Sequence, residues 1–348
     1  MAIQGFNFFT NAVDVSPAAV GSWQDVDVSA DIPVGSTGVV LDIHNTSGSY
    51  NYMVDVRKKG STDDDYSAND TQPNRHHYAV IGVDADRVFQ ACIENTLVQI
   101  WLVGYCDSNV VMFTNKIDYS LTTIDAWTDI DVSANVPAGA TGVIIKIINR
   151  DGANRRIGAI RKNGSSDARQ GNSYIYPTTL IYGLCGVDVN RIFEGYINNV
   201  NCDFYLVGYT EKPVVFLTNA IDVSIAVVNT WTDKDVTAET SPKASGAIIE
   251  MHNLAGGDRE GEVRKNGSTD ARQDTAHISR ALDEGFHIYS LVGLDDDQIF
   301  EGWISDLDVD FYLIGHSEPI EKFEASALEG FVGNRKSSNT HSMMSNLG

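Results

Sequence analysis

One phrase occurs three times in this chain at a constant spacing of 104 residues, and each occurrence starts at a tryptophan: Trp23, Trp127 or Trp231. The match extends to the Leu-Val-Gly-Tyr or Leu-Ile-Gly-His sequences that end at residues 105, 209 and 316. This period exceeds solenoid repeats of about 20 to 50 residues and equals a small domain. The sequence therefore predicts three copies of one domain. Their ranges are 1–108, 109–212 and 213–319, followed by a tail of residues 320–348.

Each copy is predicted to be a β-sandwich. In the middle copy, residues 128–132 alternate polar and apolar, as a strand with one buried face does. Residues 143–148 are mostly β-branched, which is typical of a central strand. Seven or eight such segments, separated by turn residues and without an amphipathic helix, predict an all-β chain of three tandem jelly-roll or immunoglobulin-like sandwiches. Asn163-Gly164 after a strand predicts a type I′ hairpin turn.

The tail has a different pattern from the repeats. Phe323, Ala327, Leu328 and Phe331 are spaced as on one face of a short helix, before the sequence becomes rich in Ser, Asn and Gly. A helix this short is marginal alone in water, because nucleation is costly. We therefore predict that the tail is an assembly segment that docks on another subunit or on another protein, and that the three-copy body folds without it.

Acidic residues outnumber basic ones, with a net charge of −22. Residues 1–108 carry −9, residues 109–212 carry 0 and residues 213–320 carry −13. This distribution argues against a nucleic-acid partner, because a polyanion is repelled by two of the three copies. The neutral middle copy, with Arg155 and Arg156 among its basic residues, leaves open a charge-complementary contact with an outer copy of a neighbouring molecule.

Targeting and cysteine signals are weak. The four cysteines occupy unrelated repeat positions without metal-ligand spacing, which favours buried free thiols. Residues 1–6 lack the basic start and apolar run of a signal peptide, and no segment has about 18 consecutive apolar residues. We expect synthesis in the cytoplasm and no membrane partner.

An active site should be unique or present in all three copies, and no polar constellation meets this condition. Histidines occur at unrelated positions, and the repeated glutamates lose their register in the first copy. The paired aspartates, such as Asp129 and Asp131, repeat in every copy and leave calcium open, but a solvated strand face is the better interpretation. We expect no enzyme activity, no catalytic or metal-binding residue and no cofactor.

Tryptophans leave a second function open. If exposed, Trp23, Trp127 and Trp231 could stack on sugar rings, and three weak sites on one chain would gain avidity. A multivalent carbohydrate-binding protein is therefore the alternative function. Packing of these rings at the end of each sandwich is the commoner role for a tryptophan that begins a strand.

Residues 127–143, together with residues 186–196 and 203–209, resemble the repeated β-sandwich units of bacteriophage virion proteins, particularly tail-appendage and head-decoration proteins. The resemblance covers all three copies through turn and core residues and transfers no functional residue. The third copy departs from this pattern in the turn at residues 240–246. It implies a structural, non-enzymatic component of a phage virion, assembled in the host cytoplasm and bound to other virion proteins or to copies of itself.

Overall fold

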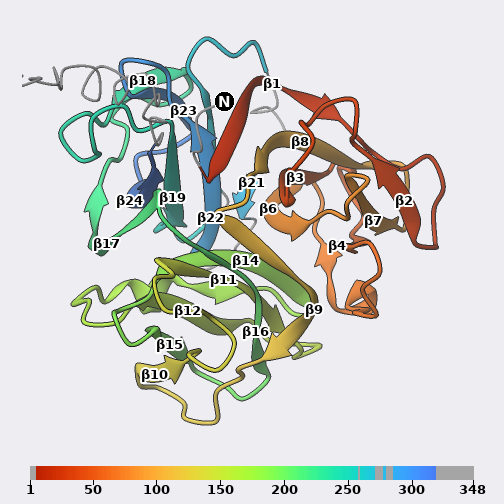
Figure 1. Cartoon of the computed structure of the whole chain (residues 1–348), viewed down its shortest axis with the longest axis horizontal. Coiled ribbons are helices and arrows are strands. Elements are labelled where there is room, and N and C mark those ends of the chain that lie inside the picture. Colours follow the sequence, from red (N-terminus) through yellow and green to blue (C-terminus); the bar gives the residue numbers. More distant parts are fainter. Residues whose placement is uncertain (1–4, 258, 271–276, 280–284, 319–348) are drawn as a thin grey trace, which may run out of the picture.

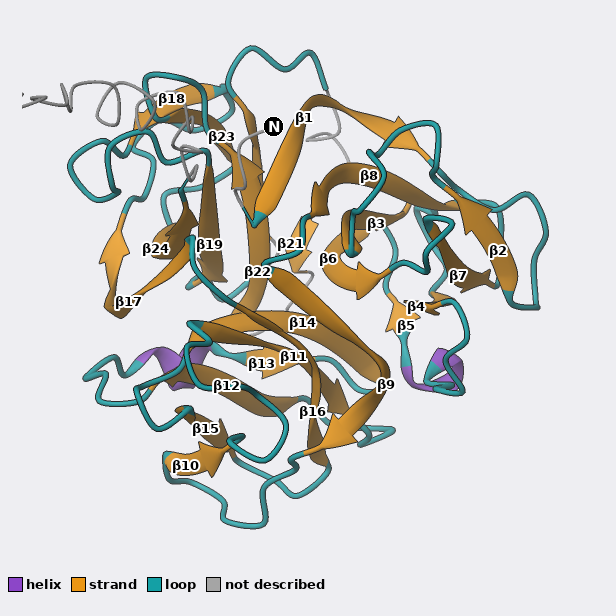
Figure 2. Cartoon of the chain, viewed as in Figure 1, coloured by secondary structure: helices purple, strands orange, loops and turns teal. Residues whose placement is uncertain are grey.

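A computed structural model of the chain describes residues 5–257, 259–270, 277–279 and 285–318. Nearly all regular structure in these residues is β, and the helical segments are two short 3-10 turns, η1 (Tyr66–Ala68) and η2 (Arg169–Asn172) (Figure 2). None of the described helices is long and apolar enough to cross a bilayer.

Each copy contributes eight strands of matching order. The first copy has β1 (Phe6–Asp14), β2 (Gln24–Asp27), β3 (Gly38–Asn45), β4 (Tyr52–Lys58), β5 (Asp70–Thr71), β6 (Arg75–Gly82), β7 (Val88–Ile93) and β8 (Val98–Cys106). The second has β9 (Val110–Asp118), β10 (Thr128–Asp131), β11 (Gly142–Asn149), β12 (Arg156–Lys162), β13 (Tyr174–Ile175), β14 (Thr179–Gly186), β15 (Ile192–Ile197) and β16 (Cys202–Thr210). The third has β17 (Val214–Asp222), β18 (Thr232–Asp235), β19 (Gly246–Asn253), β20 (Arg259–Lys265), β21 (His277–Ser279), β22 (Phe286–Gly293), β23 (Ile299–Ile304) and β24 (Val309–Ser317).

Strand order identifies the topology. In the first copy the two sheets run β1-β8-β3-β6 and β2-β7-β4-β5, and the other two copies repeat this order. Two four-stranded sheets in this order form a jelly roll, whereas an immunoglobulin-like sandwich would pair its first, second, fifth and fourth strands in one sheet. The predicted chain of tandem β-sandwiches is confirmed, and the jelly-roll alternative is the correct one.

The third strand of each copy is buried on both faces. In β11, Val143, Ile145 and Ile147 fill the core of their own jelly roll. Ile144 points the other way, into an apolar cluster shared by all three copies. This double burial explains why residues 143–148 form an almost continuous apolar run.

The three jelly rolls surround a common centre (Figure 1). Residues from all three copies form the shared cluster, which we name the axial core, and equivalent side chains meet there: Val40, Ile144 and Ile248 from the third strands, and Val80, Leu184 and Leu291 from the sixth. The third copy contacts the first as well as the second, so the arrangement is a closed ring with pseudo-threefold symmetry.

Short strands link each copy to the next. Strand β13 pairs in parallel with β22, and β21 pairs in parallel with β6. At the remaining junction the Asp70 amide donates to the Thr178 carbonyl oxygen at 2.8 Å. Backbone bonds therefore cross all three junctions in the same direction around the ring.

The predicted type I′ turn at Asn163-Gly164 is wrong. The Ser165 amide donates to the Lys162 carbonyl oxygen at 3.1 Å, and within this turn only Gly164 has a positive φ, of 81°. A type I′ turn needs positive φ at both central residues, whereas this pattern is typical of type II. The chain leaves β12 for the long loop toward the next copy instead of folding back as a hairpin.

The unusual turn sequence of the third copy keeps the conformation of the other two. Lys243 has a φ of 68°, at the position where the first two copies have Gly35 and Gly139, with φ of 92° and 100°. A lysine is strained in this region, because its Cβ approaches the following carbonyl. The surrounding turn therefore imposes the backbone shape on whichever residue stands there.

The repeated glycine near the end of each copy is a packing requirement, which gives a first prediction. A Cβ on Gly208 would lie 2.6 Å from the carbonyl oxygen of Val111, and 2.8 Å from Met112 Sδ. Gly208→Ala is expected to lower the free energy of unfolding by about 1 to 3 kcal/mol through overpacking, measured by urea denaturation. Gly152→Ala, where a Cβ meets nothing within 4 Å, is the control. Equal stability of the two variants would contradict this role.

Candidate functional site: the seams of the ring

The contacts between neighbouring copies, which we call seams, contain most of the buried charged side chains of the described residues. Seam A joins β4 and residues 59–70 of the first copy to the second copy. Seam B joins β12 and residues 163–175 of the second copy to the third. Seam C joins β20 and residues 266–270 of the third copy to the first. In each seam the partner contributes its first, third and sixth strands.

In each seam, an asparagine on the first strand of one copy accepts hydrogen bonds from the neighbouring copy. The pairing of β9 with β16 shifts register between Met112 and Ile117, which frees the residues between them. Asn115 Oδ1 accepts hydrogen bonds from Ser61 Oγ at 3.0 Å and from the Thr62 amide at 2.8 Å. Asn219 accepts the same bonds in seam B and Asn11 in seam C. Sequence reasoning missed these asparagines, although the Thr-Asn pair recurs every 104 residues.

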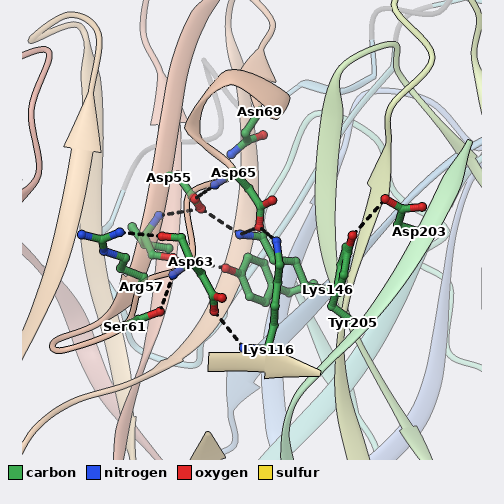
Figure 3. A network of polar contacts seen from close by, with 12 residues as sticks. Asp55, Arg57, Ser61, Asp63, Asp65, Asn69, Lys116, Lys146, Asp203 and Tyr205 are labelled. Atoms are coloured by element: carbon green, nitrogen blue, oxygen red, sulfur yellow. Dashed lines mark hydrogen bonds and ion pairs between the residues drawn. The ribbon is translucent and has the colours of Figure 1, made fainter. Parts of the chain in front are cut away.

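Seam A contains a buried cation between two carboxylates (Figure 3). Lys146 Nζ lies 2.9 Å from Asp55 Oδ1 and 3.1 Å from Asp65 Oδ2. Lys116 and Arg150 also pair with Asp65. Burial alone would raise the pKa of Asp65, but Lys146 and Lys116 lower it to about 2. Burial would likewise depress the pKa of Lys146, but the neighbouring Asp55 raises it above its usual value, so the ammonium stays charged.

Seam B reverses the positions of the charges. Glu250, which stands on β19 where Lys146 stands on β11, lies 2.6 Å from Arg169 Nη2 and 3.0 Å from His252 Nε2. Burial would raise the pKa of Glu250, but His252 and Arg169 hold it well below the usual range. Ala159 occupies the place of Asp55 in this seam.

In seam C a histidine lies between two carboxylates. His76 Nδ1 is 3.0 Å from Asp42 Oδ1, and its Nε2 is 3.6 Å from Glu262 Oε2. The Tyr78 hydroxyl donates to Glu262 Oε1 at 2.9 Å. Ligand atoms of Asp42, His76 and Glu262 lie within 4.8 Å of one another, a set of donor types that suits a divalent metal.

The three seams share one geometry and differ in charge arrangement. The third strand contributes a lysine to seam A, a glutamate to seam B and an aspartate to seam C. Two other basic residues of the middle copy pair within the chain, Arg150 with the first copy and Arg169 with the third. A charge-complementary contact between molecules stays a prediction.

Acid is expected to weaken seam A. The pKa of Asp65 is lower in the folded protein than in the unfolded chain, where it is near 3.8. The ionised Asp65 therefore adds to the free energy of unfolding at pH values above 3.8, and this stabilisation is lost as the pH falls toward about 2. We expect Asp65→Asn to remove about 2 kcal/mol of pH-dependent stability over that interval, measured by urea unfolding at a series of pH values. Asn at the exposed Asp129 should leave the profile unchanged. Parallel profiles for wild type and Asp65→Asn would refute this assignment.

The three tryptophans each lie under an arginine. The guanidinium of Arg57 is 3.8 Å from the Trp23 ring centroid, and Arg161 and Arg264 cover Trp127 and Trp231 at 4.1 and 3.9 Å. Gln90, Glu194 and Glu301 hold these arginines in place. One face of each half-buried indole is thus occupied by a cation and is not open to a sugar.

The paired aspartates serve the turns. Asp131 Oδ1 accepts the Ser133 amide at 2.8 Å, and Asp27 and Asp235 do the same for residues 29 and 237. The first aspartate of the pair in the first copy, Asp25, bonds to Gln90 and Lys59. The repeat of these residues is explained by turn geometry and surface pairing.

Arg155 and Arg156 line a cavity of about 1070 Å³. Arg156 Nε pairs with Asp151 at 2.9 Å, and the Arg155 guanidinium lies 5.7 Å from the Tyr176 ring centroid. The other proposed assembly residues, Phe323, Ala327, Leu328 and Phe331, lie outside the described residues. The role of Arg155 and Arg156 in assembly stays a prediction.

Comparison with known proteins finds only distant similarity. No protein family model and no curated protein sequence matches the chain. One similar solved structure is described as the triple jelly roll fold and turret assembly in an archaeal virus, with 10% identity over 90% of both chains and a TM-score of 0.22. Another, the M60 catalytic domain with two CBM51 domains from Clostridium perfringens ZmpB, has 6% identity over 86% of this chain and 33% of that one, with a TM-score of 0.18. The strand order and the seams define the chain as a closed ring of three jelly rolls.

Proposed function

We propose that this protein is a non-enzymatic structural component of a virus particle, such as a capsid decoration or tail-appendage protein of a bacteriophage. The observation that supports it most is the closed ring: one chain places three jelly rolls around a pseudo-threefold axis and seals each seam with its own buried charge pattern. A particle component must keep a rigid shape and present lateral faces at set angles. In the ring, the axial core and the seams connect each jelly roll to the other two.

The outer ends of the three lobes offer related but unequal contact surfaces. Val20, Ile124 and Val228 stand at equivalent positions between the first two strands and are 48%, 46% and 37% exposed. The net charges of the copies differ at the same time, from 0 in the middle copy to −13 in the third. Three similar exposed apolar side chains, on copies of different net charge, suit contacts with non-identical neighbouring proteins in a particle.

The buried ionisable groups described above favour a structural role over catalysis. Asp55, Lys146 and Glu250 are committed to partners across the seams. A general acid or base must reach a substrate, whereas these side chains are enclosed between copies.

Light scattering on size-exclusion fractions and mass spectrometry of purified particles test the proposal. We expect an assembled species and a fixed copy number of the chain per particle. A protein that stays monomeric at all concentrations and is absent from particles would show the proposal to be wrong. Glycan-array binding that is lost in Trp127→Ala, with the fold intact, would replace it by the carbohydrate-binding function.

A further inference from the structure

We propose that seam B is an acid-sensitive contact, at which the ring opens between the second and third jelly rolls when His287 takes up a proton. The inference goes beyond the proposed virion role and does not depend on it. His287 lies near the start of β22, directly opposite His252 on β19. Side chains alternate along β22, so His287 shares a face with Tyr289, which packs into the core of the second copy. The histidine pair is therefore buried between two copies.

The three seams differ at this pair of positions. In seam A the equivalent residues are Ile148 and Leu180, which are also paired across their strands and cannot titrate. In seam C they are histidines, but His76 lies between two carboxylates that would stabilise its imidazolium. In seam B the nearby carboxylate of Glu250 already pairs with an arginine and with the other histidine. Seam B is thus the seam in which a new positive charge is least compensated.

The surroundings of His287 are mainly aromatic and cationic. Its side chain is 1% exposed, and neither ring nitrogen has a hydrogen-bond partner among the described residues. Its ring lies 5.7 Å from that of His252 and 5.3 Å from that of Tyr289, measured between centroids. The segment 174–176 contributes two tyrosines to the small cavity beside it. The charged and titratable groups from the other described elements are Glu250 and His252 on β19, Arg169 on η2, and Arg75 and His77 on β6.

These surroundings oppose the charged form of His287. Burial lowers its pKa to about 3, because an imidazolium loses its hydration in the seam. Glu250 acts in the opposite direction, whereas His252 and Arg169 lower the pKa further. In an open seam the side chain meets water, and we expect its usual pKa near 6.5. Above pH 6.5 both forms are neutral at this residue. As the pH falls from 6.5 toward 3, the open form binds one more proton and is favoured by about a factor of ten per pH unit.

The contribution of His287 can be separated from those of other groups by pH. Glu250 keeps a pKa well below its usual value near 4.5, so it stays ionised between pH 6.5 and 4.5. Burial lowers the pKa of His77 to about 4, but this residue pairs with Ile43 in the core of the first copy, which seam B does not include. The interval from pH 6.5 to 4.5 therefore reports mainly on the histidines of the seam.

Distances between spin labels on the three lobes test the proposal. Val20, Ile124 and Val228 are exposed at equivalent positions, and the four native cysteines are buried, so paired cysteine substitutions at these positions can be labelled at pH 7. As the pH falls from 6.5 to 4.5, we expect the distance in Ile124→Cys/Val228→Cys, across seam B, to lengthen. The distance in Val20→Cys/Ile124→Cys, across seam A, should stay constant.

Substitution of His287 tests whether this residue is the cause. His287→Leu gives seam B the residue that seam A has at the same position, and its opening constant should rise about tenfold less per pH unit than that of wild type. His287→Asn, which is polar and does not titrate, should give the same result if the leucine variant does not fold. His316→Gln is the matched control, because it removes a buried histidine whose partners, Ser241 and Glu318, belong to the same copy. Its opening constant should follow that of wild type.

Equal pH dependence in wild type and in the His287 variants would overturn the proposal, and so would a wild-type ring that stays closed at pH 4.5. A distance across seam A that lengthens together with the distance across seam B would show general expansion in acid and would also contradict it. So would loss of the β-sheet circular dichroism signal over the same interval. The particle test can fail independently, because the opening is measured on the isolated chain.

Discussion

Lys146→Met is expected to lower the free energy of unfolding by about 3 to 5 kcal/mol. The substitution leaves Asp55, whose side chain is 1% exposed, and Asp65, 3% exposed, facing each other without the ammonium that lies between them. A buried charge that loses its partner retains its full desolvation cost. Chemical denaturation followed by tryptophan fluorescence measures the loss.

Two further variants test whether the loss of stability comes from burial of the charges or only from the number of ion pairs removed. Lys59 also bridges two aspartates, Asp25 at 2.9 Å and Asp84 at 3.8 Å, but it is 37% exposed, so Lys59→Met should cost less than about 1 kcal/mol. Adding Asp55→Ala to Lys146→Met should restore more than half of the loss, because Asp65 keeps Lys116 and Arg150. A similar cost for Lys146→Met and Lys59→Met would contradict the role of seam A.

Ile144→Asp is expected to open the ring while the separate jelly rolls remain folded. The residue is fully buried in the axial core. Burying a carboxylate there would cost about 4 to 7 kcal/mol of free energy, which corresponds to a pKa raised by about 3 to 5 units. The core of the second copy lies on the other face of β11 and is not touched. Small-angle scattering should show a larger radius of gyration, with the β-sheet circular dichroism signal retained.

Its neighbour on the same strand is the matched control. Ile145→Asp places the same charge in the core of the second copy and should unfold that copy, with loss of β-sheet signal. Val200→Asp, at a side chain that is 58% exposed, should change neither property. If Ile144→Asp and Ile145→Asp gave the same loss of signal, the axial core could not be separated from the domain cores.

Local sequence patterns were sufficient for the repeats and for the individual strands. The alternation in residues 128–132 and the apolar run in 143–148 correspond to β10 and β11, because the side-chain period of a strand is written in consecutive residues. The turn at Asn163-Gly164 was predicted wrongly, since its type depends on where the next strand lies. The jelly-roll topology was left open for the same reason: pairing partners are distant in sequence.

The candidate site could be recognised only in the tertiary structure. Asp42, Lys146 and Glu250 occupy one repeat position with different charges, which in sequence suggests a variable surface residue. Lys146 meets Asp55 across 91 residues, and Tyr78 meets Glu262 across 184. The sequence by itself therefore determined the copy number and the β-sandwich class, because core burial within each copy follows local periodicity. Ring closure and the charge pattern of the seams were decided by the tertiary structure alone, because they depend on which faces of the three jelly rolls meet. In the sequence, the charged side chains of the seams look like solvent-exposed residues. Their role becomes visible only when their partners from the neighbouring copy are in place.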